Sequence, residues 1–308
     1  MKTSYPIILK NYKEWLHTLG FATSTVYDYP LFVKHFFTYL TKKNIHQINL
    51  ITTKIVVDYF TYLEQKTGER TGQTFSTSHL NRNFLAIDKL LEFLHQMNVS
   101  NTPPPIKYSL QNHRKKPLQI LTKQEVKALY EAVPLTFNEF TFAKREARQM
   151  AVKLVLDLCY GCGLRKTEAL NLKMIDIHFN KQIIHVKQGK NYKDRYVPIN
   201  EKLIKSIENF RYNYRRELNT KRAACLPNRQ EYLYPFGTNA IADALRLLLQ
   251  QTSNTTLKNK KPTLHTLRHS IATHLLQNGM SIENIALFLG HSTLESTKLY
   301  THFLKNDE

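Results

Sequence analysis

Three consecutive prolines, Pro103 to Pro105, set the strongest limit on how this chain can fold. A proline inside a helix lacks the backbone N–H that the helix needs and clashes with the preceding turn, so no helix continues through this run. A basic stretch, IKYSLQNHRKKP, follows the prolines directly. The 308-residue length is sufficient for two hydrophobic cores. We therefore predict two domains, residues 1–105 and 118–308, joined by a basic linker over residues 106–117.

Apolar residues in the first domain recur every three or four positions, which is the spacing of one helix face. Four such stripes predict a small helical bundle. They run through Ile8, Tyr12 and Leu16; Val33, Phe36 and Leu40; Val56, Tyr59 and Leu63; and Leu80, Phe84 and Leu91. We interpret the stripes as core, which leaves the polar faces of the helices for a partner.

The second domain combines helical patterns with one short region of strand character. Thr122 and Glu125 have the spacing of a capping box and predict the start of a helix. A later helical stripe should end at Gly161 and Gly163. Apolar residues alternate over 175–179, and the runs QIIHV and RYVPI follow, which predicts a three-stranded meander. The expected fold class is mainly α with a small antiparallel β-sheet.

The charge favours a polyanionic partner. The chain has 44 Lys and Arg against 24 Asp and Glu, a formal net charge of +20. Residues 1–117 contain 15 basic and 7 acidic side chains, so both halves are basic and a ligand that contacts both would explain the excess. Nucleic acid or an anionic membrane surface fits this charge, and a basic enzyme of another kind is the alternative.

Several absences bear on where the protein acts. No apolar run approaches the length of a membrane-spanning helix, and the N-terminal sequence lacks a signal-peptide cleavage pattern. Three cysteines are too few for a disulfide framework, which fits a reducing compartment. We expect a cytoplasmic, nucleoid-associated protein with no membrane partner.

The segment HTLRH places His265 and Arg268 three residues apart on one helix. Leu264 and Leu267 mark the buried side of this helix, so we expect the His–Arg pair to project from another face. A zinc helix of the HExxH kind needs Glu where Thr266 stands, and a cation beside the ligands opposes metal binding. A phosphate suits the pair better, because guanidinium binds it in a bidentate manner. The alternative is a chance pairing on the surface.

Metal or redox chemistry has little support elsewhere. Cys159 and Cys162 form a CxxC motif, but no second pair completes a four-ligand zinc site. Cys159 also lies on the apolar stripe of its helix, so we expect it in the core. The sequence predicts neither a metal nor a cofactor.

Two further segments carry basic residues in positions that suit an anion. Arg165 in YGCGLRKTEAL stands at a helix start that follows two glycines, where backbone N–H groups also face an anion. Lys190 lies at the tip of the polar loop KQGKNYKD between two predicted strands.

The segment LGHSTLESTKLYTH adds a histidine and a tyrosine. Gly290 should end one helix, and Ser292 with Glu295 should form a capping box for the next, which places His291 at the junction. Tyr300 follows near the end of that last helix. Since the chain has 17 tyrosines, Tyr300 on its own would more often be a core or surface residue.

These motifs together resemble the tyrosine recombinase family, also called phage-integrase-type or Xer-type recombinases. GLRKTEAL is similar to its first arginine motif, KQGKNYKDRYVPI to its lysine-bearing β-hairpin, HTLRHSIATHLL to its HxxR helix, and LGHSTLESTKLYTH to its histidine and tyrosine segment. Four motifs in the family order, over residues 161–302, make a specific match. The first domain agrees only in shape with the family's helical core-binding (SAM-like) domain.

The resemblance implies a role for each matching residue: Arg165 and Arg268 bind the phosphate, Lys190 is the general acid, His265 handles a proton, His291 hydrogen-bonds the phosphate and Tyr300 is the nucleophile. Glu168 matches an acidic position that braces Arg165. Elementary chemistry agrees, because cations stabilise the charge that develops on an attacked phosphodiester. A tyrosine with an ordinary pKa of about 10 also needs a cationic setting to attack near neutrality.

The implied function is site-specific DNA recombination by a two-domain clamp that closes around duplex DNA. Strands would be cut and rejoined through a 3′-phosphotyrosyl intermediate and a Holliday junction, without ATP or metal. The implied assembly is a homotetramer that pairs two sites, with a related recombinase as an alternative partner. A catalytically silent DNA-binding protein of the same fold is the competing hypothesis, and a metal-dependent nuclease lacks the clustered carboxylates it would need.

Overall fold

The computed structural model describes residues 4–68, 72–99, 102–108, 118–187, 194–218, 231–234, 238–291 and 293–301. The chain divides into two compact units, Met1–Lys116 and Pro117–Glu308. Each unit has its own hydrophobic core. The described residues contain no helix with both the length and the apolar character needed to cross a bilayer.

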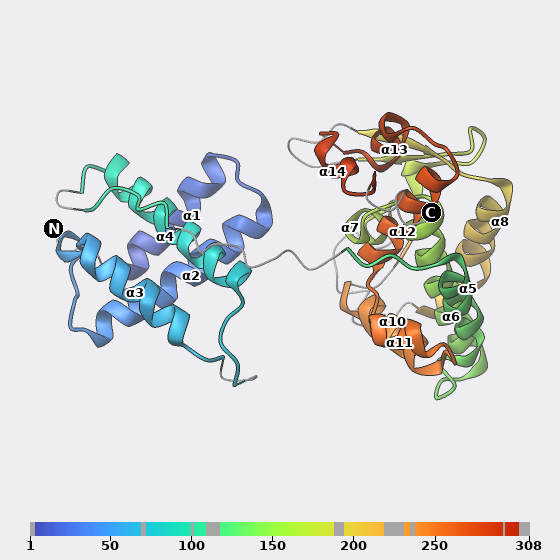
Figure 1. Ribbon diagram of the computed structural model, residues 1–308, viewed down its shortest axis with the longest axis horizontal. Helices are drawn as coiled ribbons and strands as arrows, with labels where there is room; N and C mark the ends of the chain where they lie inside the picture. The colour runs from blue at the N-terminus through green and yellow to red at the C-terminus, as the bar shows by residue number, and fades with distance from the viewer. Residues whose placement is uncertain are drawn as a thin grey trace. The chain divides into compact units, whose positions relative to one another are not determined.

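The first unit is built from helices (Figure 1). Its four α-helices are α1 (Tyr5–Thr18), α2 (Thr23–Lys42), α3 (Thr53–Gln65) and α4 (Thr77–Gln96). The apolar stripes predicted from the sequence meet in one core, in which the rings of Phe60 and Phe84 lie 4.3 Å apart. Ile106 and Tyr108, in the segment predicted to be linker, also pack against this core.

The second unit combines helices with a small sheet, which lies at one edge of the unit near α13 (Figure 1). Its helices are α5 (Lys123–Ala132), α6 (Phe142–Leu156), α7 (Lys166–Leu170), α8 (Glu201–Asn209), α10 (Thr238–Gln251), α11 (Thr255–Lys260), α12 (Leu264–Gln277), α13 (Ile282–Leu289) and α14 (Glu295–Lys298). The predicted capping box opens α5, where the Glu125 backbone N–H donates to Thr122 Oγ1 and the Thr122 N–H donates to Glu125. A π-helical turn, Asp157–Gly161, extends α6 to the loop before α7.

The sheet is the predicted antiparallel meander, in the order β1 (Ile177–His178), β2 (Ile183–Val186) and β3 (Arg195–Pro198). Ile184 pairs with Ile177 on one side and with Val197 on the other, so these three apolar residues share the buried face. The first strand begins later than its alternation suggested, because Met174–Asp176 form a 3₁₀ turn that leaves Ile175 77% exposed. The mainly helical fold with a small antiparallel sheet is confirmed.

Candidate active site

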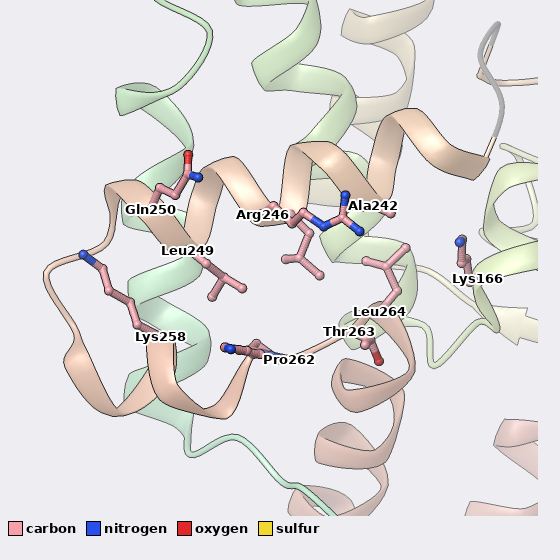
Figure 2. Close-up of a pocket in the computed structure, with 11 residues that line it drawn as sticks. Lys166, Ala242, Arg246, Leu249, Gln250, Lys258, Pro262, Thr263 and Leu264 are labelled. Carbon is pink, nitrogen blue, oxygen red and sulfur yellow. The ribbon is translucent and has the colours of Figure 1, made fainter. Parts of the chain in front are cut away.

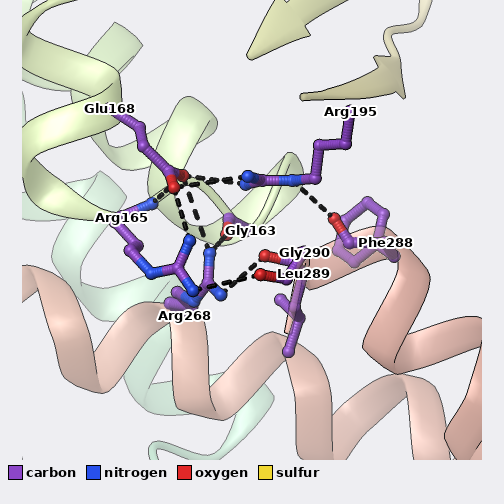
Figure 3. Close-up of polar contacts among 8 residues, drawn as sticks. All are labelled: Gly163, Arg165, Glu168, Arg195, Arg268, Phe288, Leu289 and Gly290. Carbon is purple, nitrogen blue, oxygen red and sulfur yellow. Dashed lines mark hydrogen bonds and ion pairs between the residues drawn. The ribbon is translucent and has the colours of Figure 1, made fainter. Parts of the chain in front are cut away.

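Glu168 is the centre of the charged cluster in the second unit, and three arginines surround its carboxylate (Figure 3). Arg165 Nη1 donates to Glu168 Oε1 at 2.6 Å, and Arg195 Nη2 donates to Oε2 at 2.8 Å. Arg268 Nη1 lies 3.7 Å from Oε2. Burial raises the pKa of Glu168, but the hydrogen bonds and charge of Arg195, with those of Arg165, outweigh it and lower the pKa to about 2. Glu168 is therefore ionised at neutral pH, and the cluster keeps an excess of positive charge.

Arg268 is buried rather than projecting from a polar face, and that part of our prediction is wrong. Its side chain is 2% exposed, and its guanidinium donates to the carbonyl oxygens of Gly163 at 2.6 Å and Leu289 at 2.7 Å. These carbonyls belong to segments far from α12 in the sequence, so the bonds join three parts of the unit. Burial, followed by the charge of Arg165, lowers the pKa of Arg268 to about 10, which leaves it charged at neutral pH.

The carbonyls that hold the arginines depend on two glycines in left-handed conformation. Gly163 has φ +60°, and a Cβ there would lie 2.7 Å from the Phe288 ring and 2.8 Å from the Leu289 side chain. Gly290 ends α13 with φ 66°, and its carbonyl accepts a hydrogen bond from Arg165 Nη2. Only glycine adopts such a φ without strain, so these two residues fix where the arginine-binding carbonyls point.

Tyr300 follows α14 and is buried, with 1% of its surface exposed. Its ring packs in a small apolar cluster with Ala272 and Leu276 of α12 and Leu289 of α13. Its hydroxyl lies 2.8 Å from Nδ1 of His269. Burial raises the pKa of Tyr300, and the charges of Arg268 and Arg165 offset part of that rise. The phenol is therefore protonated at rest, and the nearby arginines favour its anionic form.

Histidines surround the tyrosine on two sides. The His291 ring stacks on the Tyr300 ring with centroids 6.5 Å apart, and His291 Nδ1 lies 2.7 Å from Thr297 Oγ1. The His265 ring, which is exposed, meets the ring of His269 edge-on at 4.8 Å. Burial lowers the pKa of His269 and His291 to about 4, and the part of the His265 ring that is covered also lowers the pKa of His265. All three are neutral at pH 7.

The structure thus brings together five of the predicted site residues: Arg165, His265, Arg268, His291 and Tyr300. The sixth, Lys190, lies outside the described residues. The capping box predicted after His291 is wrong, because it placed the helix start at Ser292. Helix α14 begins after Leu294 and has no side-chain cap. Ser292 itself lies outside the described residues.

Sequence reasoning missed two residues of the cluster. Arg195 is 6% exposed, donates to Glu168 with both Nη atoms and also donates to the Phe288 carbonyl. Its position in the alternating run RYVPI, on the same face as Val197, was the available signal. His269 directly follows Arg268 in HTLRHS, but nothing in the spacing indicated a contact with Tyr300.

A cavity of about 730 Å³ lies beside the cluster, between α10, α11 and the start of α12 (Figure 2). Lys166, which follows Arg165, and Leu264, which precedes His265, both line it. Its apolar floor includes Ala242, Leu245, Leu249 and Pro262, and its basic residues are Lys166, Arg246, Lys258 and Lys261. The lining thus combines an apolar surface with four basic side chains.

Comparison with known proteins bears on the family of the chain. The sequence model of the phage integrase family matches residues 119–307, which is more than half of the chain. The chain belongs to the phage integrase family. A tyrosine recombinase of Thermosipho africanus is 28% identical over 296 residues, which cover 96% of this chain and 94% of the relative. XerA of Pyrococcus furiosus is 34% identical over 181 residues, 59% of this chain and 56% of that one.

Solved structures of family members share the fold. The XerH site-specific recombinase bound to its difH substrate in a pre-cleavage complex has a TM-score of 0.63 and 17% identity, covering 99% of this chain and 84% of XerH. The Tn1549 transposon integrase in complex with transposon right end DNA has a TM-score of 0.64 and 16% identity, covering 95% and 94%. The resemblance to tyrosine recombinases that the motifs indicated is confirmed, as are the predicted enzyme class and site-specific recombination.

Proposed function

We propose that this site-specific tyrosine recombinase cuts DNA with Tyr300 and stabilises the reacting phosphate with Arg165 and Arg268. Tyr300 Oη attacks a phosphodiester, forms a 3′-phosphotyrosyl bond and releases a 5′-hydroxyl. The observation that carries this proposal is the packing of Tyr300 against α12, the helix that also holds Arg268. The phosphotyrosyl bond conserves the energy of the broken linkage, so rejoining needs neither ATP nor a metal.

The arginines act on the non-bridging oxygens. A phosphodiester under attack passes through a five-coordinate state whose equatorial oxygens carry more charge, so fixed cations stabilise that state more than the ground state. A guanidinium has five N–H donors. The two carbonyl bonds of Arg268 fix its plane, and other N–H groups remain for a phosphate. Glu168 keeps Arg165 in place at 2.6 Å, and its negative charge offsets part of the repulsion among the three adjacent arginines.

The remaining residues handle protons and orientation. Lys190 acts as the general acid that protonates the leaving 5′ oxygen, as the family motif implies. The lowered pKa of His265 supports a role in proton transfer, because a neutral imidazole both accepts and donates a proton. His291 donates a hydrogen bond from Nε2 to the phosphate, and Thr297 near Nδ1 supports that orientation.

Both units bind DNA in this proposal. Each half of the chain has a basic excess, and the basic cavity of Figure 2 is lined by Lys166, the residue after Arg165. The solved recombinases with the same fold hold a difH substrate and transposon DNA. We infer that the N-terminal unit is a core-binding domain, that four protomers pair two sites and pass through a Holliday junction, and that the protein acts in the cytoplasm on the nucleoid.

Covalent trapping tests the proposal against a silent DNA-binding protein. Purified protein is incubated in EDTA with fragmented genomic DNA of its source, and the protein–DNA adducts are recovered under denaturing conditions and sequenced. The wild type should form adducts at a defined site, and Tyr300→Phe should bind the same site without an adduct. Absence of any wild-type adduct on the bound DNA would favour the silent protein, and strict dependence on Mg²⁺ would contradict the metal-free mechanism.

A further inference from the structure

The hydroxyl of Tyr300 has a specific partner that the family motifs did not point to. His269 Nδ1 lies 2.8 Å from Tyr300 Oη, and the two ring centroids are 5.8 Å apart. The tyrosine is buried, and His269 is partly buried. A hydrogen bond between two covered groups is held in one geometry, unlike a contact between mobile surface side chains.

The direction of this hydrogen bond follows from the charge state of the imidazole. Burial, followed by the charges of His265 and Arg268, lowers the pKa of His269 to about 4, so the ring is neutral at pH 7. A neutral imidazole has one donor and one acceptor nitrogen. Since the phenol of Tyr300 is protonated, its O–H donates and Nδ1 accepts, which leaves the ring proton on Nε2.

We propose that His269 is the base that takes the hydroxyl proton of Tyr300 during DNA cleavage. This rests on the proposed role of Tyr300 as nucleophile. As the bond from Oη to phosphorus forms, the proton moves from Oη to Nδ1 and the bond from phosphorus to the 5′ oxygen breaks. In rejoining, the 5′-hydroxyl attacks the phosphotyrosyl bond, and His269 returns the proton to the departing Oη.

Other groups near the tyrosine are placed less well for this step. His291 stacks on the face of the ring, and its Nδ1 contacts Thr297 instead of the hydroxyl. His265 contacts the ring of His269 and is exposed. Arg165 and Arg268 are cations that cannot accept a proton. Among the residues that the structure describes, His269 is the hydrogen-bond acceptor at Oη.

The charges in the site explain why the proton stays on Tyr300 until DNA binds. At rest, Arg268 and the neighbouring His265 disfavour an imidazolium at His269, and burial of Tyr300 disfavours a phenolate. A bound phosphodiester brings negative charge beside Arg268, which favours imidazolium formation at His269. The acidity of the phenol also rises as its oxygen bonds to phosphorus. Proton transfer is thereby coupled to the presence of substrate.

The test compares His269→Asn with the wild type on a nicked suicide duplex that contains the site recovered by adduct mapping. Asparagine keeps an oxygen that accepts a hydrogen bond from Tyr300 but cannot take its proton. We expect adduct formation to slow by about 10²–10⁴-fold, the usual contribution of a general base, with DNA affinity unchanged. Replacing Tyr300 with 3,5-difluorotyrosine, whose phenol is far more acidic, should restore most of the rate in His269→Asn.

Control variants distinguish a loss of the base from a structural defect and from a failure of the proposed role of Tyr300. His274→Asn removes another buried histidine of α12, whose Nδ1 lies 2.9 Å from the Tyr160 hydroxyl. In this variant, difluorotyrosine at position 300 should change the rate of adduct formation no more than it does in the wild type. His269→Gln replaces His269→Asn if the latter does not fold, as judged by its thermal midpoint. A wild-type rate in the folded variant, or an equal defect with tyrosine and difluorotyrosine, would overturn the proposal. An adduct in Tyr300→Phe would instead overturn the role of Tyr300.

Discussion

The two units of the protein bury different kinds of side chain. The core of the N-terminal unit is built mainly from rings and aliphatic groups, including Phe36, Phe60 and Phe84, and a buried carboxylate, Asp88, accepts a hydrogen bond from the Ile106 backbone N–H. The C-terminal unit has a comparable apolar core, but it also buries Arg195 and Arg268 beside Glu168. Burying charges costs several kcal/mol per ion unless each is paired and hydrogen-bonded. In the second unit, the buried charges lie where the recombinase motifs meet.

An apolar core and a buried ionic cluster differ in how precisely they position polar atoms. An apolar core stabilises its unit without specifying the position of any one polar atom, and it tolerates changes that conserve volume. A buried ionic cluster fixes donors in position, which is what a phosphate site requires, but it fails when one partner is removed. The following predictions test this contrast, from the largest expected effect to the smallest.

Glu168→Gln should be the most destabilising isosteric change in the protein. It removes the negative charge that compensates Arg165, Arg195 and Arg268, and breaking a buried ionic network typically costs about 3–5 kcal/mol. Urea denaturation of the C-terminal unit measures the loss. Glu125→Gln is the matched control, because this buried carboxylate pairs with Lys260 alone among the described cations. An equal decrease in the free energy of unfolding for the two variants would show that the three arginines add nothing to the dependence of stability on Glu168.

Arg268→Lys should abolish most DNA cleavage while the protein still binds DNA. A lysine cannot make the bidentate contact, and burial beside Arg165 would lower its pKa and favour the uncharged amine. The expected decrease in cleavage rate is about 10²–10³-fold, as for loss of one transition-state donor. Arg211→Lys, at an exposed arginine, is the control and should cleave normally. A normal rate for Arg268→Lys would contradict a role of the guanidinium in catalysis.

Acid should destabilise the C-terminal unit through its buried histidines. The pKa of His269 and His291 is about 4 in the folded protein, below the ordinary value of 6.5. As the pH falls from about 6.5 to 4, the unfolded chain binds protons that the folded protein does not, so each histidine reduces stability by about 1.4 kcal/mol per pH unit. The double variant with asparagine at both positions should have a flatter dependence over this range. The same slope in both proteins would refute the assignment.

The smallest effect concerns two tyrosines in the N-terminal core. The hydroxyl of Tyr59 is buried without a hydrogen-bond partner among the described residues, whereas that of Tyr12 donates to the Ala86 carbonyl at 3.0 Å. Tyr59→Phe should therefore be neutral or stabilising by up to about 1 kcal/mol, and Tyr12→Phe should cost about 1 kcal/mol. Thermal unfolding distinguishes the two. A clear loss of stability in Tyr59→Phe would show that its hydroxyl has an unseen partner.

Local patterns predicted the features that depend on neighbours in the sequence. The four stripes of the first unit form its core, and the run RYVPI pairs with QIIHV as expected. Gly290 ends α13, since its left-handed φ is a local property of a helix end. The order of the motifs along the chain indicates the family without reference to any contact between them.

Features that depend on distant carbonyls and packing were not predictable. The leucines Leu264 and Leu267 marked the buried side of the helix, so the sequence assigned Arg268 to another face. The residue is buried because Gly163 and Leu289, from two other segments, supply its acceptors. The contact of His269 with Tyr300 likewise requires α12 and the segment after α14 to pack together, and neither sequence segment specifies the other.

The most direct test of the account is to identify the amino acid that becomes attached to DNA. Adducts trapped on a nicked suicide duplex in EDTA are digested with protease and nuclease, and the modified peptide is sequenced by mass spectrometry. We expect a nucleotide attached by its 3′ phosphate to Tyr300, and no such peptide from Tyr300→Phe. Attachment to another residue, or a 5′-phosphate linkage, would contradict it.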